Sequence, residues 1–297
     1  MVAMQPPSQE DLTADQEAAV QAEILAEVHR LRTHPNFEQL RRILVVDLPP
    51  DLHLFFQLTA AAYPHSGSPF DGVRAESGEE AARRMFNLLN GGVQEGARSA
   101  IYHLGRLQAL EQEVRRLGTE MMASVKPTRP MSLGLSSNAL TSEYEAFTLM
   151  SRATLDRLSW FFRAYFKANA RNLYTLKSEL GNNRRGDAPA QRLIAAIDRH
   201  ADYLDTQIST DKVARSTTRD RLAHREYVIF TTINIMGMAD GSVQAVGVTP
   251  DGRITDDPSG ALMDQFEELK ATIIDLVASF LDGDDLKRQV AAVAVRQ

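Results

Sequence analysis

Cysteine is absent from the 297 residues of this chain. Its absence excludes disulfide bonds, thiolate nucleophiles, Cys-ligated zinc and iron–sulfur clusters, and it fits a reducing compartment. Long apolar runs are also missing: no stretch of about 18 apolar residues occurs, so we expect no transmembrane helix. The polar segment Met1–Asp15 lacks the apolar centre of a signal peptide. The sequence therefore predicts a cytoplasmic protein with no membrane partner.

Basic residues are fewer than acidic residues in this chain. Lysine and arginine number 33 against 39 aspartates and glutamates, which gives a net charge of −6. A broad, non-specific nucleic-acid surface would be basic, so this balance argues against one but leaves room for a local basic cleft. The hydrophobic fraction of 43% is enough for a sizeable core in one large or two modest domains.

Several catalytic signatures are missing as well. The chain has no Gly-x-Ser-x-Gly, no His-Glu-x-x-His and no dinucleotide fingerprint. Gly91-Gly92 lacks a preceding strand and a following Gly-Lys-Ser/Thr, so it predicts the end of a helix rather than a phosphate loop. Asp198 and Asp202 would share a helix face, but His200 would point about 200° away. We expect neither a metal nor a cofactor.

Helical periodicity dominates what is present. A helix is expected to begin at Pro50, and Ser77 is expected to cap another, with Glu80 as its capping-box acid. Residues 63–76 are expected to form a loop. The other predicted helices span residues 14–32, 77–89, 93–125, 141–180, 189–208 and a final helix from Pro258. The apolar stripe of the 93–125 helix is Ile101, Leu104, Leu107, Leu110, Val114, Leu117 and Met121.

The sequence changes character after residue 226. Tyr227–Ile233 is β-branched and aromatic, Ala239–Ser242 is a turn signal, and Val243–Val248 is a second strand candidate. These features predict a small β-hairpin at about 227–254, although residues 227–238 could instead continue a preceding helix. The predicted fold class is mainly α, a helical bundle with a β-hairpin insertion.

Domain organisation follows from composition. Pro127, Pro130 and Gly134 make the segment 126–137 the expected boundary. The predicted parts are a disordered tail at 1–12, an N-terminal helical region at 13–130, a helical bundle at 138–285 and a tail at 286–297.

The segment Arg219-Asp220-Arg221-Leu222-Ala223-His224 places an arginine, an acid and a histidine within six residues. On a helix, Asp220 and His224 lie one turn apart, so Asp220 can fix the tautomer of His224. Arg219 would lie about 140° from His224 around the same helix. Arg219 can stabilise a phosphate, and His224, with an ordinary pKa of about 6.5, can move a proton. Three arrangements would bring these groups together: the long arginine side chain curls around the helix, the helix begins inside the segment, or two chains pool their segments.

This segment resembles the motif of the HEPN superfamily, an arginine and a polar residue followed by a histidine after four to six intervening residues. The resemblance covers roughly residues 138–285. It implies a helical bundle that forms a homodimer with two motifs at a shared cleft. Many members are metal-independent endoribonucleases of toxin, antiphage or RNA-processing systems, in which the residues matching Arg219 and His224 are catalytic and the ribose 2′-hydroxyl is the nucleophile. An antitoxin or defence-system partner would follow from such a role, whereas other members have lost catalysis.

Alternatives stay open for each of these sites. Arg184, Arg185, Arg221 and Arg225 are candidates for RNA phosphate contacts, or they belong to a solvated turn and a charged helix face. The aromatic run around Trp160 can stack bases or form core. The segment 219–224 itself can be an ordinary surface helix. Two functions therefore compete: an HEPN-like RNA-binding protein with endoribonuclease activity, and a non-catalytic helical module for dimerisation or partner binding.

Overall fold

The structure, a computed structural model, describes residues 46–63, 69–125, 130–136, 138–207, 232–238, 240–248, 254–255 and 257–281, together with residues 22, 26, 288 and 290. The chain divides into two compact units, Met1–Val46 and Asp47–Gln297. The segment 126–137, which we expected to be a boundary, falls inside the second unit, and helices from both sides of it share one core. The tails predicted at 1–12 and 286–297 lie almost entirely outside the described residues.

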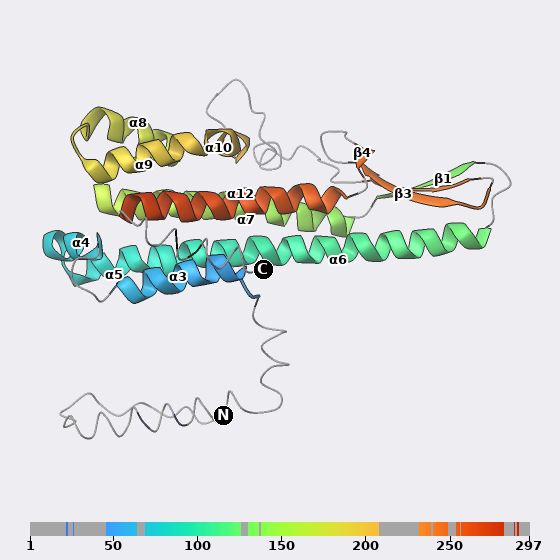
Figure 1. Cartoon of the computed structure of the whole chain (residues 1–297), viewed down its shortest axis with the longest axis horizontal. Helices are drawn as coiled ribbons and strands as arrows, with labels where there is room; N and C mark the ends of the chain where they lie inside the picture. Colours follow the sequence, from blue (N-terminus) through green and yellow to red (C-terminus); the bar gives the residue numbers. More distant parts are fainter. Residues whose placement is uncertain are drawn as a thin grey trace. The chain divides into compact units, whose positions relative to one another are not determined.

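The predicted fold class is confirmed: the described part of the second unit is a helical bundle with a small antiparallel sheet (Figure 1). Its helical elements are α3 (Pro50–Ala62), α4 (Pro69–Ser77), α5 (Glu79–Asn87), the π-helical turn η1 (Leu88–Val93), α6 (Gln94–Val125), α7 (Asn138–Phe166), α8 (Leu173–Asn183), α9 (Ala188–Arg199), α10 (Ala201–Gln207) and α12 (Pro258–Leu281). Its strands are β1 (Met131–Ser136), β2 (Thr232–Gly237), β3 (Val243–Val248) and β4 (Ile254–Thr255).

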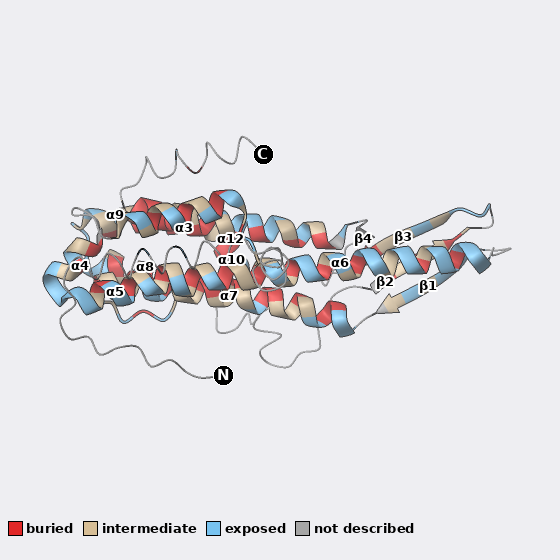
Figure 2. Ribbon diagram, turned by 90° about the horizontal axis from the view of Figure 1, so that it is seen from below, coloured by how far each residue is buried: buried red, intermediate tan, exposed pale blue. Residues whose placement is uncertain are grey.

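The helices of this unit lie in layers. Figure 1 shows α7 and α12 between α8–α10 on one side and α3, α5 and α6 on the other. Buried residues run along α7, α12 and α6, where these layers meet (Figure 2). Phe161 and Phe162 of α7 pack edge to face against Phe280 of α12, which joins the two central helices. Trp160 is about half exposed, whereas its neighbours Phe161 and Phe162 belong to the core.

Small residues bring α6 and α7 close together. Ala97 and Ala100 are fully buried, and a Cβ atom added to Gly96 would lie 2.4 Å from Oγ1 of Thr154 on α7. Thr154 in turn donates this hydroxyl to the carbonyl of Met150, 2.7 Å away, so its position is fixed. The absence of a side chain at Gly96 therefore sets the distance between the two longest helices described.

The expected helix stop at Gly91-Gly92 is wrong. The backbone continues through α5, η1 and α6 without leaving a helical conformation, because η1 accommodates both glycines in a π-helical turn. Arg157 of α7 donates from Nη1 to the carbonyl of Gly92, 3.0 Å away. This bond satisfies a carbonyl of the irregular turn. It also joins η1 to α7, in addition to the contact between Gly96 and Thr154.

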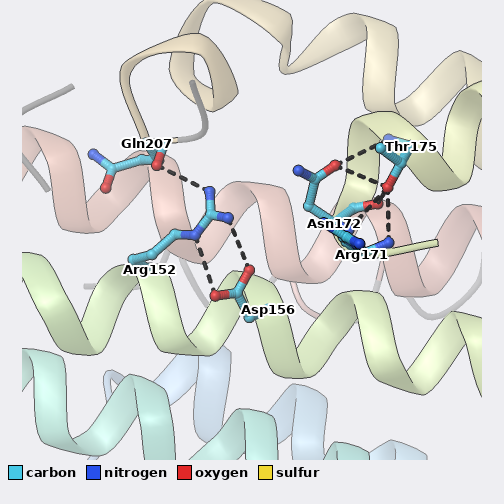
Figure 3. Close-up of polar contacts among 6 residues, drawn as sticks. All are labelled: Arg152, Asp156, Arg171, Asn172, Thr175 and Gln207. Carbon is cyan, nitrogen blue, oxygen red and sulfur yellow. Dashed lines mark hydrogen bonds and ion pairs between the residues drawn. The ribbon is translucent and has the colours of Figure 1, made fainter. Parts of the chain in front are cut away.

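The helix predicted over residues 141–180 is broken instead into α7 and α8. Lys167, just after α7, has φ of 53°, a left-handed conformation that ends the helix. A capping box then starts α8: Asn172 accepts from the backbone N–H of Thr175, and the Thr175 hydroxyl accepts from the backbone N–H of Asn172 (Figure 3). Capping at residue 172 sends the chain back along α7 rather than onward.

Two other local predictions need correction. Within the loop expected at 63–76, residues from Pro69 onward form α4, because Phe70 is buried and packs against Tyr63 and Phe86. The capping box expected at Ser77 does not form. Gly78 is the N-cap residue of α5, with φ of 85°, and Glu80 pairs with Arg84 instead.

The sheet has the order β1-β2-β3-β4, with every neighbouring pair antiparallel. The β2–β3 hairpin confirms the expected β insertion, but β1 lies in the segment 126–137, which we expected to be a domain boundary without a strand. Ile233 and Ile235 are buried, and a Cβ atom on Gly118 of α6 would lie 2.8 Å from Cγ1 of Ile235. The sheet therefore packs directly on the C-terminal half of α6.

This sheet contact also corrects the apolar stripe of α6. Leu117 and Met121 were expected to face the core, but they are 51% and 49% exposed. Gly118 and Met122, one position further along, are buried instead, because the partner of α6 changes from α7 to the sheet along the helix.

Buried polar contacts tie the layers together. Nζ of Lys270 on α12 lies 2.8 Å from Oδ2 of Asp51 on α3. Burial alone would lower the pKa of Lys270, but hydrogen bonds to Asp51 and Glu267 outweigh it and raise the pKa. Buried Glu111 of α6 accepts the backbone N–H of Ser259, 3.2 Å away in the first turn of α12. A carboxylate there is stabilised by the positive end of the helix dipole.

We predict opposite effects for alanine at two glycines of α6. Gly96→Ala should lower the free energy of unfolding by about 1–3 kcal/mol, because the new methyl group overlaps the fixed hydroxyl of Thr154. Gly105→Ala, on the same helix with nothing within 4 Å of its Cβ position, should raise it by about 0.5–1 kcal/mol. Urea unfolding followed by circular dichroism measures both. Equal effects of the two substitutions would contradict the close α6–α7 contact.

Candidate functional site

The predicted catalytic segment lies outside the described residues, in the part of the chain that joins Gln207 at the end of α10 to Thr232 at the start of β2. This applies to Arg219, Asp220 and His224, and also to Arg221 and Arg225. Their roles stay predictions.

The two predicted RNA-binding arginines that are described contact helix ends. Arg184 donates from Nη2 to the carbonyl of Phe166, 3.4 Å away, and its Nη1 lies 4.0 Å from Oδ2 of Asp187. Arg185 donates from Nε to the carbonyl of Gly181, 3.2 Å away. These bonds satisfy carbonyls near the ends of α7 and α8. They favour the solvated-turn interpretation, while phosphate binding by either arginine stays a prediction.

A cavity of about 450 Å³ lies where α7, α10 and α12 meet. We call it the α10 cavity, because four of its wall residues belong to that helix. Its wall is formed by Tyr144, Thr148, Arg199, His200, Asp202, Tyr203, Thr206, Gln207, Gln265 and Glu268. Most of these side chains are polar or aromatic, which makes the cavity the best candidate site among the described residues.

A break in the helix predicted over 189–208 creates one side of this cavity. Asp187 caps the start of α9, and Pro189 follows in its first turn. His200 ends α9 with a non-helical conformation, φ −104° and ψ 17°, and α10 starts at the next residue. The break allows consecutive side chains, Arg199 and His200, to reach one carboxylate.

That carboxylate is Asp275 of α12. Arg199 donates to it from Nε and Nη2, at 3.0 and 3.1 Å, and Nε2 of His200 lies 3.2 Å from its Oδ2. Nη2 of Arg199 also donates to the hydroxyl of Ser279, 3.0 Å away. The charges of Arg199 and Asp275 therefore compensate each other, and the joint between α9 and α10 is held on α12.

The end of α10 is held on α7 by Arg152. This arginine donates from Nη1 to the carbonyl of Gln207, 3.0 Å away, and binds both carboxylate oxygens of Asp156 (Figure 3). A cation at the C-terminus of a helix is stabilised by the helix dipole. Gln207 itself is buried, so the wall of the cavity at this end is fixed by both its backbone and its side chain.

Two carboxylates of the wall have no such compensation. Asp202 and Glu268 are exposed and form no ion pair with any described residue. Tyr203, which also lines the wall, is buried, and its hydroxyl has no hydrogen-bond partner among the described residues. Burial raises the pKa of Tyr203, and the negative charge of Glu268 raises it further.

The sequence offered one signal for this site. Asp198 and Asp202 were expected to share a helix face, but the break at His200 separates them: Asp198 pairs with Lys177 of α8, and Asp202 lines the cavity. Asp275, Tyr144 and Glu268 come from helices far away in sequence, so no local motif could have pointed to them. Within the described ranges, no three histidine, aspartate or glutamate side chains gather as metal ligands would.

Comparisons of the chain with protein-family models, with curated proteins and with solved structures found no match. Among the helices that the structure describes, none combines the length and the apolar character needed to span a membrane.

We predict that Asp275 holds the α9–α10 joint. Asp275→Asn removes the negative charge that Arg199 and His200 contact, so the free energy of unfolding should fall by about 1–3 kcal/mol. Amide hydrogen exchange in α10 should become faster. Asp264→Asn, an exposed position on the same helix, should change stability by less than about 0.5 kcal/mol. Unchanged exchange in α10 would show that the joint does not depend on Asp275.

Proposed function

We propose that this chain is an HEPN-like RNA-binding protein that cleaves RNA without a metal ion. The observation that carries the proposal is the sequence Arg219-Asp220-Arg221-Leu222-Ala223-His224. Its context supports the proposal: α8, α9 and α10 precede it, α12 follows it, and the fold class is mainly α. A helical bundle with a helix on each side of the motif is what the HEPN resemblance leads us to expect.

The proposed chemistry uses the substrate as its own nucleophile. The ribose 2′-hydroxyl attacks the adjacent phosphorus, and the bond from phosphorus to the 5′-oxygen of the next nucleotide breaks. His224 accepts the proton of the 2′-hydroxyl or gives one to the departing 5′-oxygen, and solvent water takes up or supplies the other proton. Arg219 stabilises the charge on the phosphate. Asp220 orients the imidazole of His224. The products are a 2′,3′-cyclic phosphate and a 5′-hydroxyl.

The proposed active site requires a homodimer. On one regular helix, Arg219 and His224 would lie about 140° apart, too far around to meet at a single phosphate. In a homodimer, the arginine of one protomer and the histidine of its partner can face the same phosphate.

A non-catalytic partner-binding module is the second candidate, and one observation favours it. Leu117, Met121 and Val125 follow one another at intervals of four along α6, and each is about half exposed. An apolar stripe of this kind, on a protein with a net charge of −6, suits contact with another protein better than contact with RNA.

RNA cleavage in the presence of EDTA tests the proposal. We expect the wild-type protein to cut mixed single-stranded RNA, and Arg219→Ala and His224→Ala to lower the rate by about 100-fold or more. An oligonucleotide with a single 2′-deoxyribose at the cut position should resist cleavage there. Mass spectrometry of the products should show cyclic phosphate ends.

Matched controls use an arginine and a histidine outside the motif. Arg83 of α5 and His53 of α3 are exposed, so Arg83→Ala and His53→Ala should cleave RNA at the wild-type rate. Cleavage that is equal in all five proteins would reveal a contaminating nuclease and overturn the proposal. RNA binding without any cleavage would leave the non-catalytic module as the explanation.

A further inference from the structure

The α10 cavity has an unbalanced negative charge. Its one arginine, Arg199, is held by Asp275 through two hydrogen bonds, so this pair contributes no net charge to the wall. Asp202 and Glu268 line the cavity from α10 and α12, and neither has an ion-pair partner among the described residues. Within the described wall, a ligand would therefore meet two carboxylates and no uncompensated cation.

The hydroxyl of Tyr203 gives independent evidence that the cavity binds a ligand. The residue is only 8% exposed, yet its hydroxyl forms no hydrogen bond with any described residue. A buried polar group without a partner costs about 1–3 kcal/mol, so native structures rarely keep one. Because Tyr203 and Glu268 both line the cavity, a ligand bound there can supply the missing hydrogen bond.

The remaining wall suits a positively charged organic group. Tyr144 and Tyr203 are both largely buried in the wall, and the faces of tyrosine rings attract cations. Gln207, Gln265 and Thr148 add neutral groups that can accept hydrogen bonds. The volume of about 450 Å³ lies in the range of small-molecule sites.

We propose that the α10 cavity is a binding site for a small organic amine, whose ammonium group is held by Asp202, Glu268 and the hydroxyl of Tyr203. An ammonium group donates hydrogen bonds to both carboxylates and to the phenol oxygen, so it satisfies all three groups at once. Phosphates and carboxylates are repelled by the same two acids. The proposal is argued from described residues alone, and it does not depend on RNA cleavage.

Three probes of equal chain length test this proposal by isothermal titration calorimetry. Butane-1,4-diamine carries the ammonium groups, butane-1,4-diol replaces them with hydroxyls, and butanedioate replaces them with carboxylates. We expect the diamine to bind with a Kd of about 1 mM or lower, and the other two to bind at least about tenfold more weakly. Equal binding of diamine and diol, or no binding of the diamine, would overturn the proposal.

Substitutions then locate the binding. Glu268→Gln and Asp202→Asn should each weaken diamine binding about tenfold, and Tyr203→Phe should weaken it about threefold or more. Asp264→Asn removes the same charge one turn before Glu268 on α12, outside the cavity wall, and should bind like the wild type. An equal loss for Glu268→Gln and Asp264→Asn would show that only the overall charge matters, which would also refute the site.

The source of the ammonium group can be distinguished in the same way. A lysine side chain of another protein has the same chemistry, and Nα-acetyl-lysine methylamide imitates it. We expect butane-1,4-diamine to bind more tightly than the lysine derivative, because the diamine carries no peptide groups that the cavity would also have to hold. Binding of the lysine derivative alone would refute the small amine in favour of a peptide. RNA cleavage by Glu268→Gln should stay at the wild-type rate, so the two proposals can fail independently.

Discussion

The close contact between α6 and α7 is the constraint on which the rest of this unit depends. Gly96 leaves room for the hydroxyl of Thr154, and Arg157 binds the carbonyl of Gly92 one turn earlier. α12 packs against both helices, and α7 also carries Arg152, which holds the end of α10. If α6 and α7 moved apart, the core between them would lose contacts and the support of α10 would shift with it. The position of the α10 cavity therefore depends on the contact between α6 and α7, although α6 does not line the cavity.

The irregular turn η1 follows from the same constraint. A π-helical turn holds one residue more than an α-helical turn, so it rotates the helix that follows it. Leu89 and Val93 are buried within this turn, and Ala97, Ala100 and Leu104 are buried after it. The turn thus keeps apolar residues facing α7 along the whole chain from α5 to α6, although the sequence does not keep a strict helical period there.

Much of this fold could be predicted from local sequence, because local sequence determines most of its elements. α6, α12 and the β2–β3 hairpin have clear periodicity and turn signals, and all three are present. β1 could not be predicted, since Met131–Ser136 is short and contains a glycine, and its pairing partner β2 lies far away in sequence. The stripe of α6 was misplaced beyond Val114 for a similar reason: the sheet that covers Gly118 comes from a distant part of the chain.

The candidate site was less predictable than the fold. Asp198, His200 and Asp202 were recognised as a polar group, but their roles depend on the break between α9 and α10 and on Asp275 of α12. No pattern within α9 shows that a carboxylate from α12 will meet Arg199 and His200. The motif at 219–224 is the reverse case: it stands out in the sequence, and the structure does not describe it.

The pairing of β1 with β2 has a consequence for the order in which the chain assembles. Met131 pairs with Gly237 and Ser136 with Thr232, so the whole of residues 137–231 lies within a loop that this pairing closes. Closing such a long loop costs conformational entropy that α7 and its neighbours reduce by folding first. We therefore expect the strands to join late in folding. When they do, the stretch that carries Arg219 and His224 becomes anchored at both ends, to the bundle through α10 and to the sheet through β2.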